Sequence, residues 1–189
     1  MSARASRRAS GAQLIQREWV FRGRAISVRS DRIVMPNGEP TVREVIEYPR
    51  SVAIVPVPEP GWVILIRQYR YCAGQYLWEI PAGTLERGEA PVSAARRELR
   101  EETGQTAARL TLMADLFTSP GVLTERMRLY VATNLTPAPL EPDRDECIRV
   151  YRFRVSRALE MVSKRRIRDG KSLLGLALLA QLHPDLAAL

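Results

Sequence analysis

The first part of the chain alternates short apolar runs with turn-forming residues, a pattern typical of β-strands. Residues 18–49 are extended segments on either side of Asn37-Gly38, a dipeptide that favours a tight hairpin turn. The same pattern of strand, turn and strand repeats around Pro58 to Gly61, where a proline- and glycine-containing turn leads into the apolar run Trp62 to Ile66. A shorter run, 77–83, follows and is interrupted by a proline and a glycine. We therefore expect several strands before residue 84.

The apolar spacing changes to three and four residues between Glu89 and Thr103. Val92, Ala95 and Leu99 recur at this spacing, which places them on one face of a helix. Gly104 directly follows and is the residue type that most often ends a helix at the C′ position. The pattern predicts an amphipathic helix over 89–103.

The rest of the chain returns to strands and ends in helices. We expect strands at 108–115, 127–132 and 147–155, a loop at 136–146, and helices at 156–164 and 170–182, the second ended by Pro184. Mixed strands with a few helices indicate an α+β fold or an α/β sandwich.

Composition and charge narrow the picture. The chain has 189 residues and a formal net charge of +8, and its length favours one domain. Residues 1–32 carry eight arginines and only two acidic residues, whereas the remainder is close to neutral. Residues 1–12 are therefore expected to be a disordered basic tail, solvated or, as the alternative, a nucleic-acid arm. The near-neutral remainder argues against a long cationic groove and a nucleic-acid partner.

Other features bear on location. The longest apolar run, 172–182, is too short to span a bilayer, so no membrane partner is expected. The N-terminus lacks the apolar stretch of a secretory signal. Cys72 and Cys147 do not make a disulfide framework. These observations predict a cytoplasmic protein.

The strongest chemical signal lies on the predicted helix 89–103. Glu98, Glu101 and Glu102 are spaced so that all three carboxylates project from one helical face. Carboxylate oxygens so grouped suit Mg²⁺, or alternatively Mn²⁺, and the neighbouring Arg97 can hold a carboxylate in place. An isolated run of this composition would more often be a solvated face with ion pairs. The spacing of the glycine, glutamate and arginine residues in and around this helix decides between these interpretations.

Gly83, Glu89, Arg97-Glu98, Glu101-Glu102 and Gly104 are separated by fixed numbers of residues. At about 5% per residue type, seven such matches arise by chance on the order of once in 10⁹ start sites. The segment resembles the Nudix box of the Nudix hydrolases. One position differs: the final apolar residue of the box is Gln105 here.

The Nudix resemblance implies an α/β/α sandwich with a mixed β-sheet, joined here to N-terminal antiparallel strands. It also implies metal-dependent hydrolysis of a nucleoside diphosphate linked to another group. Within that pattern, Glu98, Glu102 and the carbonyl of Ala82 would be metal ligands. Glu101 would be a further ligand or a supporting acid, and Arg97 would orient the carboxylates.

Beyond the box, the chain looks most like the ADP-ribose pyrophosphatase branch. Pro120 follows Gln105 at this branch's spacing, within a Ser-Pro-Gly segment. Arg70, Glu79, Arg43 and Glu44 match positions that the branch uses near substrate. Each residue also has a purely structural interpretation. Pro120 would be a loop proline, Arg70 a solvated charge at a strand end, and Glu79 a buried paired acid. Arg43 and Glu44 would be ordinary residues of the sheet surface.

The branch completes its site with an acid from a late loop. Glu146 matches best by register and would act as general base or further metal ligand, with Glu141, Asp143 and Asp145 as competitors. The branch is usually a homodimer, so residues 13–48 would form a dimerisation element and 49–189 the hydrolase domain.

We therefore expect Mg²⁺-dependent hydrolysis of ADP-ribose to AMP and ribose 5-phosphate. Three alternatives stay open: the same chemistry on GDP-mannose, ADP-glucose, NADH or FAD, a non-catalytic nucleotide-binding regulator, and an RNA-processing hydrolase. The intact acids Glu98, Glu101 and Glu102 argue against the regulator, because a pure sensor does not need a metal cluster.

Overall fold

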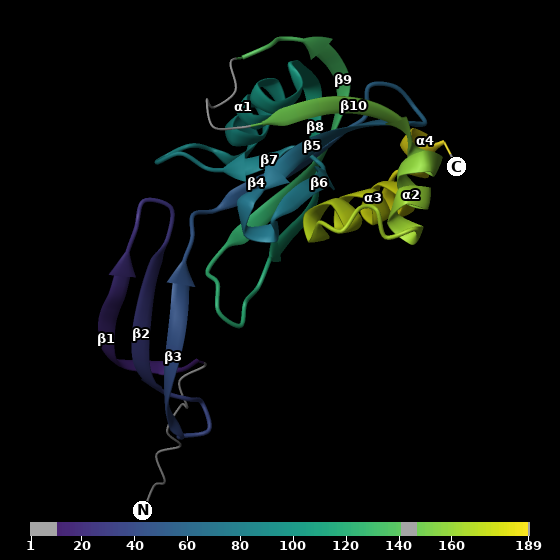
Figure 1. Cartoon of the computed structure of the whole chain (residues 1–189). Coiled ribbons are helices and arrows are strands. Elements are labelled where there is room, and N and C mark those ends of the chain that lie inside the picture. Colours follow the sequence, from purple (N-terminus) through teal and green to yellow (C-terminus); the bar gives the residue numbers. More distant parts are fainter. Residues whose placement is uncertain (1–10, 141–146, 189) are drawn as a thin grey trace, which may run out of the picture. The chain divides into compact units, whose positions relative to one another are not determined.

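A computed structural model describes residues 11–140 and 147–188 (Figure 1). The predicted tail up to residue 10 lies outside the described residues, as do Glu146 and its three competitors in the 141–146 segment. The chain divides into two compact units, one formed by Met1–Pro49 with Phe117–Arg126 and the other by Arg50–Leu116 with Met127–Leu189.

The N-terminal unit is built on a three-stranded antiparallel sheet. Its strands are β1 (Gln13–Arg22), β2 (Ser27–Val34) and β3 (Pro40–Glu47), in the order β1-β2-β3. The predicted turn at Asn37-Gly38 joins β2 to β3, and two backbone hydrogen bonds close it, Met35 to Glu39 and Gly38 to Met35. A later segment packs with these strands, because Leu123 forms a parallel bridge with Ile46.

The larger unit contains two sheets. Its strands are β4 (Ser51–Pro56), β5 (Trp62–Arg70), β6 (Gln75–Glu79), β7 (Ala82–Thr84), β8 (Gln105–Phe117), β9 (Arg126–Pro137) and β10 (Ile148–Arg154). One sheet has the order β10-β5-β6 and is antiparallel. The other has the order β7-β4-β9-β8 and is mixed, because β4 runs parallel to β9 and antiparallel to β7.

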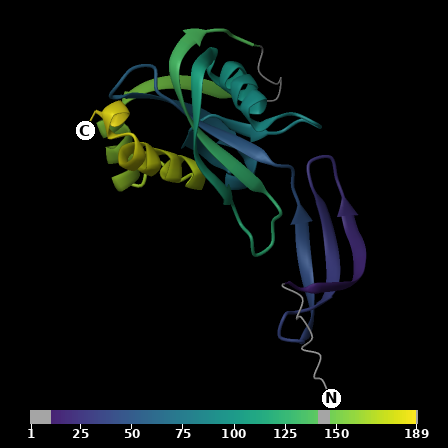
Figure 2. The same cartoon turned by 180° about the vertical axis from the view of Figure 1, so that it is seen from behind.

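Helices cover both sides of these sheets. They are α1 (Pro91–Thr103), α2 (Val155–Ser163), α3 (Gly170–Leu182) and α4 (Pro184–Ala187), with a 3-10 turn, η1 (Tyr71–Ala73). Within this unit α1 lies on the opposite side of the strands from α2 and α3 in both views (Figures 1 and 2). No helix in the described part of the chain is long and apolar enough to cross a membrane.

The side chains of β4 point alternately to its two faces, and a hydrophobic cluster lies on each face. Val52 and Ile54 pack with Ala95 and Leu99 of α1, whereas the intervening residues Ala53 and Val55 join the cluster that includes α2 and α3. Successive side chains of a strand point to opposite faces, so a strand covered on both sides is apolar throughout. The α+β class and the sandwich with a mixed sheet are thereby confirmed.

Several element bounds differ from the sequence prediction. Helix α3 has the expected bounds, but α1 begins at Pro91 rather than at Glu89. Proline is favoured at the first helical position, where no backbone donor is needed. Strands β8 and β9 are longer than expected. The predicted stop at Pro184 is also the start of a short helix, α4.

Candidate active site

The acidic side chains of helix α1 differ in how far they are buried. Its first position is Pro91, and Gly104 ends it with a φ of 70°, a left-handed conformation that glycine adopts without strain. Between these ends, Glu98 is only 8% exposed and Glu102 only 3%, whereas Glu101 is half-buried. Two buried carboxylates one helical turn apart are costly unless cations or hydrogen-bond donors compensate them.

Arg97 supplies much of this compensation. Its Nη1 donates to Glu98 at 2.8 Å and to Glu101 at 2.9 Å. Nε and Nη2 make a two-point contact with Glu89 at 3.1 and 3.0 Å, and Nη2 also donates to the Thr84 carbonyl at 3.0 Å. One guanidinium therefore links the strand β7, the loop and the acidic face of α1.

The electrostatics follow from these contacts. Hydrogen bonding to Glu89, reinforced by the nearby Glu98 and Glu101, raises the pKa of Arg97 despite its partial burial. In return, the hydrogen bonds from Arg97 lower the pKa of Glu89. Both groups stay charged over the physiological pH range, so the arrangement is a permanent ionic clamp.

The strand β7, which precedes the helix, approaches the acids closely. The backbone N–H of Ala82 donates to Glu102 Oε2 at 2.9 Å. Next to it, a Cβ added at Gly83 would overlap the Glu98 carboxylate. The glycine at this position is therefore explained by a close approach of backbone to carboxylate.

The donor set suits a hard divalent cation. Glu98 and Glu102 offer buried carboxylate oxygens beside the backbone of Ala82, and hard oxygen ligands are those that Mg²⁺ prefers. No three histidine, cysteine or acidic side chains converge as a ready-made metal cage within residues 11–140 and 147–188. Arg97 and the Ala82 N–H occupy oxygens of these carboxylates, so a cation would compete with contacts already formed.

A second ionic group joins the last residue of β5 to the last residue of β6, two strands that pair antiparallel. Arg70 forms a two-point contact with Glu79, 2.8 Å from Nε to Oε1 and 2.8 Å from Nη2 to Oε2. Glu79 is 1% exposed and also accepts from Lys171. Hydrogen bonding to Glu79, with smaller contributions from Glu102 and Asp169, raises the pKa of Arg70.

Three expected substrate-binding residues belong to the N-terminal unit. Arg43 and Glu44 are exposed on β3, where the Arg43 guanidinium donates to Thr41 and to the Val42 carbonyl. Pro120 is exposed in the segment 118–125. The structure groups Arg97, Glu98, Glu101, Glu102 and Ala82 in the larger unit, and their roles stay predictions.

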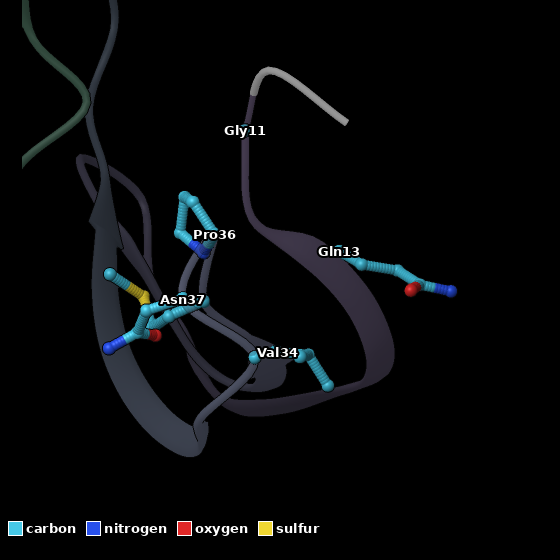
Figure 3. A pocket seen from close by; sticks show the side chains of 7 residues that line it. Gly11, Gln13, Val34, Pro36 and Asn37 are labelled. Carbon is cyan, nitrogen blue, oxygen red and sulfur yellow. The ribbon is translucent and has the colours of Figure 1, made fainter. Parts of the chain in front are cut away.

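A hollow in the N-terminal unit lies around the turn between β2 and β3 (Figure 3). It is lined by Gly11, Gln13, Val34, Met35, Pro36, Asn37 and Gly38. None of these residues carries a charge or a nucleophile, and the Gln13 amide points away from the turn in Figure 3. This hollow therefore has no group suited to phosphate chemistry.

Two contacts of the site were not anticipated from the sequence. The motif includes Glu89 but does not indicate that this residue is the main partner of Arg97. The sequence gives no sign of the contact of Lys171, because its partner Glu79 is far away along the chain. The Asp-Gly-Lys-Ser start of α3 signals a helix cap but carries no sign of that distant contact.

Comparisons with known proteins show what this chain resembles. Residues 47–173 match the NUDIX domain family. An ADP-ribose pyrophosphatase from Bacillus subtilis is 36% identical over 160 residues, 84% of this chain and 86% of that protein. A methanol dehydrogenase activator from Bacillus methanolicus is 33% identical over 162 residues, 85% and 88% of the two chains.

A GDP-mannose pyrophosphatase from Yersinia enterocolitica is 32% identical over 152 residues, 75% of this chain and 78% of that protein. Among solved structures, the crystal structure of an ADP compounds hydrolase superposes with a TM-score of 0.82 at 28% identity. That match covers 92% of this chain and 94% of the other.

Proposed function

The chain belongs to the Nudix hydrolase family, and from that premise we propose that it hydrolyses the pyrophosphate bond of ADP-ribose to AMP and ribose 5-phosphate. The relative from Bacillus subtilis, described as an ADP-ribose pyrophosphatase, supports the substrate. The observation that carries the proposal is the clamp on α1, where Arg97 holds Glu89, Glu98 and Glu101 around one guanidinium.

Nudix hydrolases use a divalent metal, and we propose Mg²⁺, with Mn²⁺ as an alternative. Glu98, Glu102 and the carbonyl of Ala82 would hold it. When bound, a divalent cation neutralises charge on the diphosphate and acidifies the attacking water. Support comes from the all-oxygen donor set and from the burial of both carboxylates.

The chain's own residues would do the remaining work. Arg97 would orient the carboxylates of Glu98 and Glu101 through the hydrogen bonds that it donates to both. Arg70 has two nitrogens engaged by Glu79, while its Nη1 makes no hydrogen bond to any described residue and can donate to a phosphate oxygen. Glu101 would be a further ligand or supporting acid, and Glu146 the proposed general base.

A turnover screen tests the proposal. Purified protein with Mg²⁺ or Mn²⁺ would be given ADP-ribose, GDP-mannose, ADP-glucose, NADH, FAD and capped RNA, with products separated by chromatography. We expect preference for ADP-ribose with AMP as product. Preference for another diphosphate would contradict the substrate and keep the chemistry, whereas nucleotide binding without turnover of any compound would contradict the hydrolase assignment.

A second candidate is the same reaction on a nucleotide sugar. The relative from Yersinia enterocolitica, described as a GDP-mannose pyrophosphatase, favours it. The α1 acids cannot discriminate between these substrates, because they address the diphosphate and not the nucleoside. Arg43, Glu44 and Pro120 are the proposed nucleoside-side contacts, so their alanine variants should change the ratio of the two activities.

We also propose a homodimer in which residues 13–48 form the contact. All ten residues of β1 are exposed, and Leu14, Ile15, Val20 and Phe21 are large apolar side chains among them. A strand of this kind exposed to water is typical of an interface. Light scattering coupled to gel filtration should give twice the mass of the chain, and Val20→Arg with Phe21→Arg should shift it to the mass of one chain.

A cytoplasmic location is proposed as well. Cys72 and Cys147 are both exposed free thiols in the structure, the state that a reducing compartment maintains. Fractionation of cells that express the tagged protein tests this, since recovery in a membrane or secreted fraction would contradict it.

A further inference from the structure

The N-terminal turn of α3 contacts the end of β6, at Glu79, and the next residue, Ile80, shortly before β7 begins. The first contact is ionic: Lys171 donates to the buried carboxylate of Glu79, and its Nζ also lies 3.1 Å from Asp169 Oδ2. The Lys171 side chain is only 13% exposed, so solvent screens this pair weakly.

The second contact fixes the backbone. Asp169 is the N-cap of α3 and accepts from the Ser172 N–H at 3.0 Å. It also accepts from the Ser172 hydroxyl, whose oxygen in turn accepts from the Ile80 N–H at 2.8 Å. Ile80 lies two residues before Ala82, which donates to Glu102. The position of Lys171 relative to Glu79 is therefore set by a chain of hydrogen bonds.

The charges of this group balance. Arg70 and Lys171 bring two positive charges, and Glu79 and Asp169 bring two negative charges. Without Lys171 the group would carry a net negative charge. An anionic diphosphate would then approach a more negative surface.

We propose that Lys171 is a positioning residue for the diphosphate of the substrate: it neutralises Glu79, so that the guanidinium of Arg70 keeps its attraction for a phosphate. This inference rests on the proposed function, because it assigns Arg70 to that phosphate. Lys171 itself is engaged by Glu79 and Asp169 and would not touch the substrate.

The main test compares Lys171→Met with wild type in two ways. Steady-state kinetics with ADP-ribose separate KM from kcat, and calorimetry measures the Kd of ADP-ribose without metal, when no turnover occurs. We expect KM and Kd to rise about five- to tenfold, with kcat changed less than threefold. Unchanged KM and Kd would overturn the proposal.

Charge-compensating variants distinguish this role from a general loss of structure. Lys171→Arg and the double variant Asp169→Asn/Lys171→Met both restore neutrality, and asparagine keeps the helix cap. We expect both to return Kd to within about threefold of wild type. If Lys171→Met does not fold, Asp169→Asn alone still tests the idea, since its extra positive charge should lower Kd. Weak binding that persists in both neutral variants would overturn it.

Lys164→Met is the matched control. Lys164 is the chain's other lysine and also pairs with a carboxylate, Glu160, but on the exposed surface of α2. We expect wild-type Kd and kinetics for this variant. The two proposals fail separately: wild type that binds ADP-ribose without hydrolysing it contradicts the proposed function, whereas hydrolysis with an unchanged Kd in Lys171→Met contradicts only this inference.

Discussion

Gly83 lies so close to Glu98 that no side chain, not even a methyl group, fits between the backbone of β7 and that carboxylate. The contact sets the distance between β7 and the acidic face of α1. Glycine is therefore required at this position because there is no space for a side chain, and not because of its backbone conformation.

Gly83→Ala should therefore impair catalysis more than folding. The added methyl group would push the Glu98 carboxylate away from its present position, and we expect turnover of ADP-ribose to fall at least about 100-fold. The measurement is kcat, together with a thermal melt to verify the fold. Gly170→Ala is the control, because nothing lies within 4 Å of a Cβ added there. Equal activity in both variants would show that the close approach is unimportant.

Arg97→Lys should also inactivate the protein although it keeps the positive charge. Lysine cannot reproduce the two-point contact with Glu89 while also reaching Glu98 and Glu101. We expect kcat to fall about 100-fold or more. Arg87→Lys, at an exposed loop position, serves as the control and should behave as wild type. A fully active Arg97→Lys would mean that charge alone suffices.

Glu102→Gln tests the metal-ligand assignment. The amide oxygen of glutamine can still accept from the Ala82 N–H, so the fold should be retained while the negative charge is lost. We expect turnover to fall about 100-fold or more and the Mg²⁺ concentration for half-maximal activity to rise. Glu160→Gln, an exposed helical carboxylate, is the control. Near-normal turnover would remove Glu102 from the proposed ligands.

The stability of the protein should depend on pH through Glu79. Burial raises the pKa of its carboxyl, but hydrogen bonding to Arg70 and the charge of Lys171 outweigh burial and leave the pKa below the ordinary 4.5. A group with a depressed pKa in the folded state stabilises it above the unfolded pKa, and that stability is lost as the pH falls. The free energy of unfolding should therefore decline below about pH 4.5.

Urea denaturation between pH 3 and 7 would measure this decline. Glu79→Gln should be less stable at neutral pH and show a shallower slope at acidic pH. Glu160 provides the contrast: hydrogen bonds from Lys164 and Arg157 lower its pKa to about 2, yet the carboxylate is exposed. Salt of about 0.5 M should remove the contribution of Glu160 and leave that of Glu79. An identical slope in Glu79→Gln and wild type would contradict the assignment.

Local signals in the sequence predicted the fold class and most of the helix bounds. Helix α3 has its predicted bounds because Asp169 caps one end and the chain turns before Pro184 at the other. Helix α1 was predicted to begin at Glu89, shortly before Val92, the first apolar residue of the helical spacing. Its carboxylate instead binds Arg97 and the Glu86 N–H, so the chain stays in a loop until Pro91.

Contacts between residues far apart along the chain could not be predicted from local sequence patterns. The pair of Lys171 and Glu79 joins residues that are 92 positions apart, and no periodicity within either segment points to the other. The packing of Leu123 with Ile46 was missed for the same reason. The motif identified the acidic residues of α1, whereas the contacts of α3 with Glu79 and Ile80 depend on the tertiary fold.

The contact between Ser172 and Ile80 also bears on the order in which the site forms during synthesis. Helix α1, with all its acids, leaves the ribosome well before Asp169, Lys171 and Ser172 have been translated. Until then the carboxylate of Glu79 lacks its lysine and the N–H of Ile80 lacks its acceptor. A nascent chain therefore carries the complete acidic motif before α3 can make its contacts with Glu79 and Ile80.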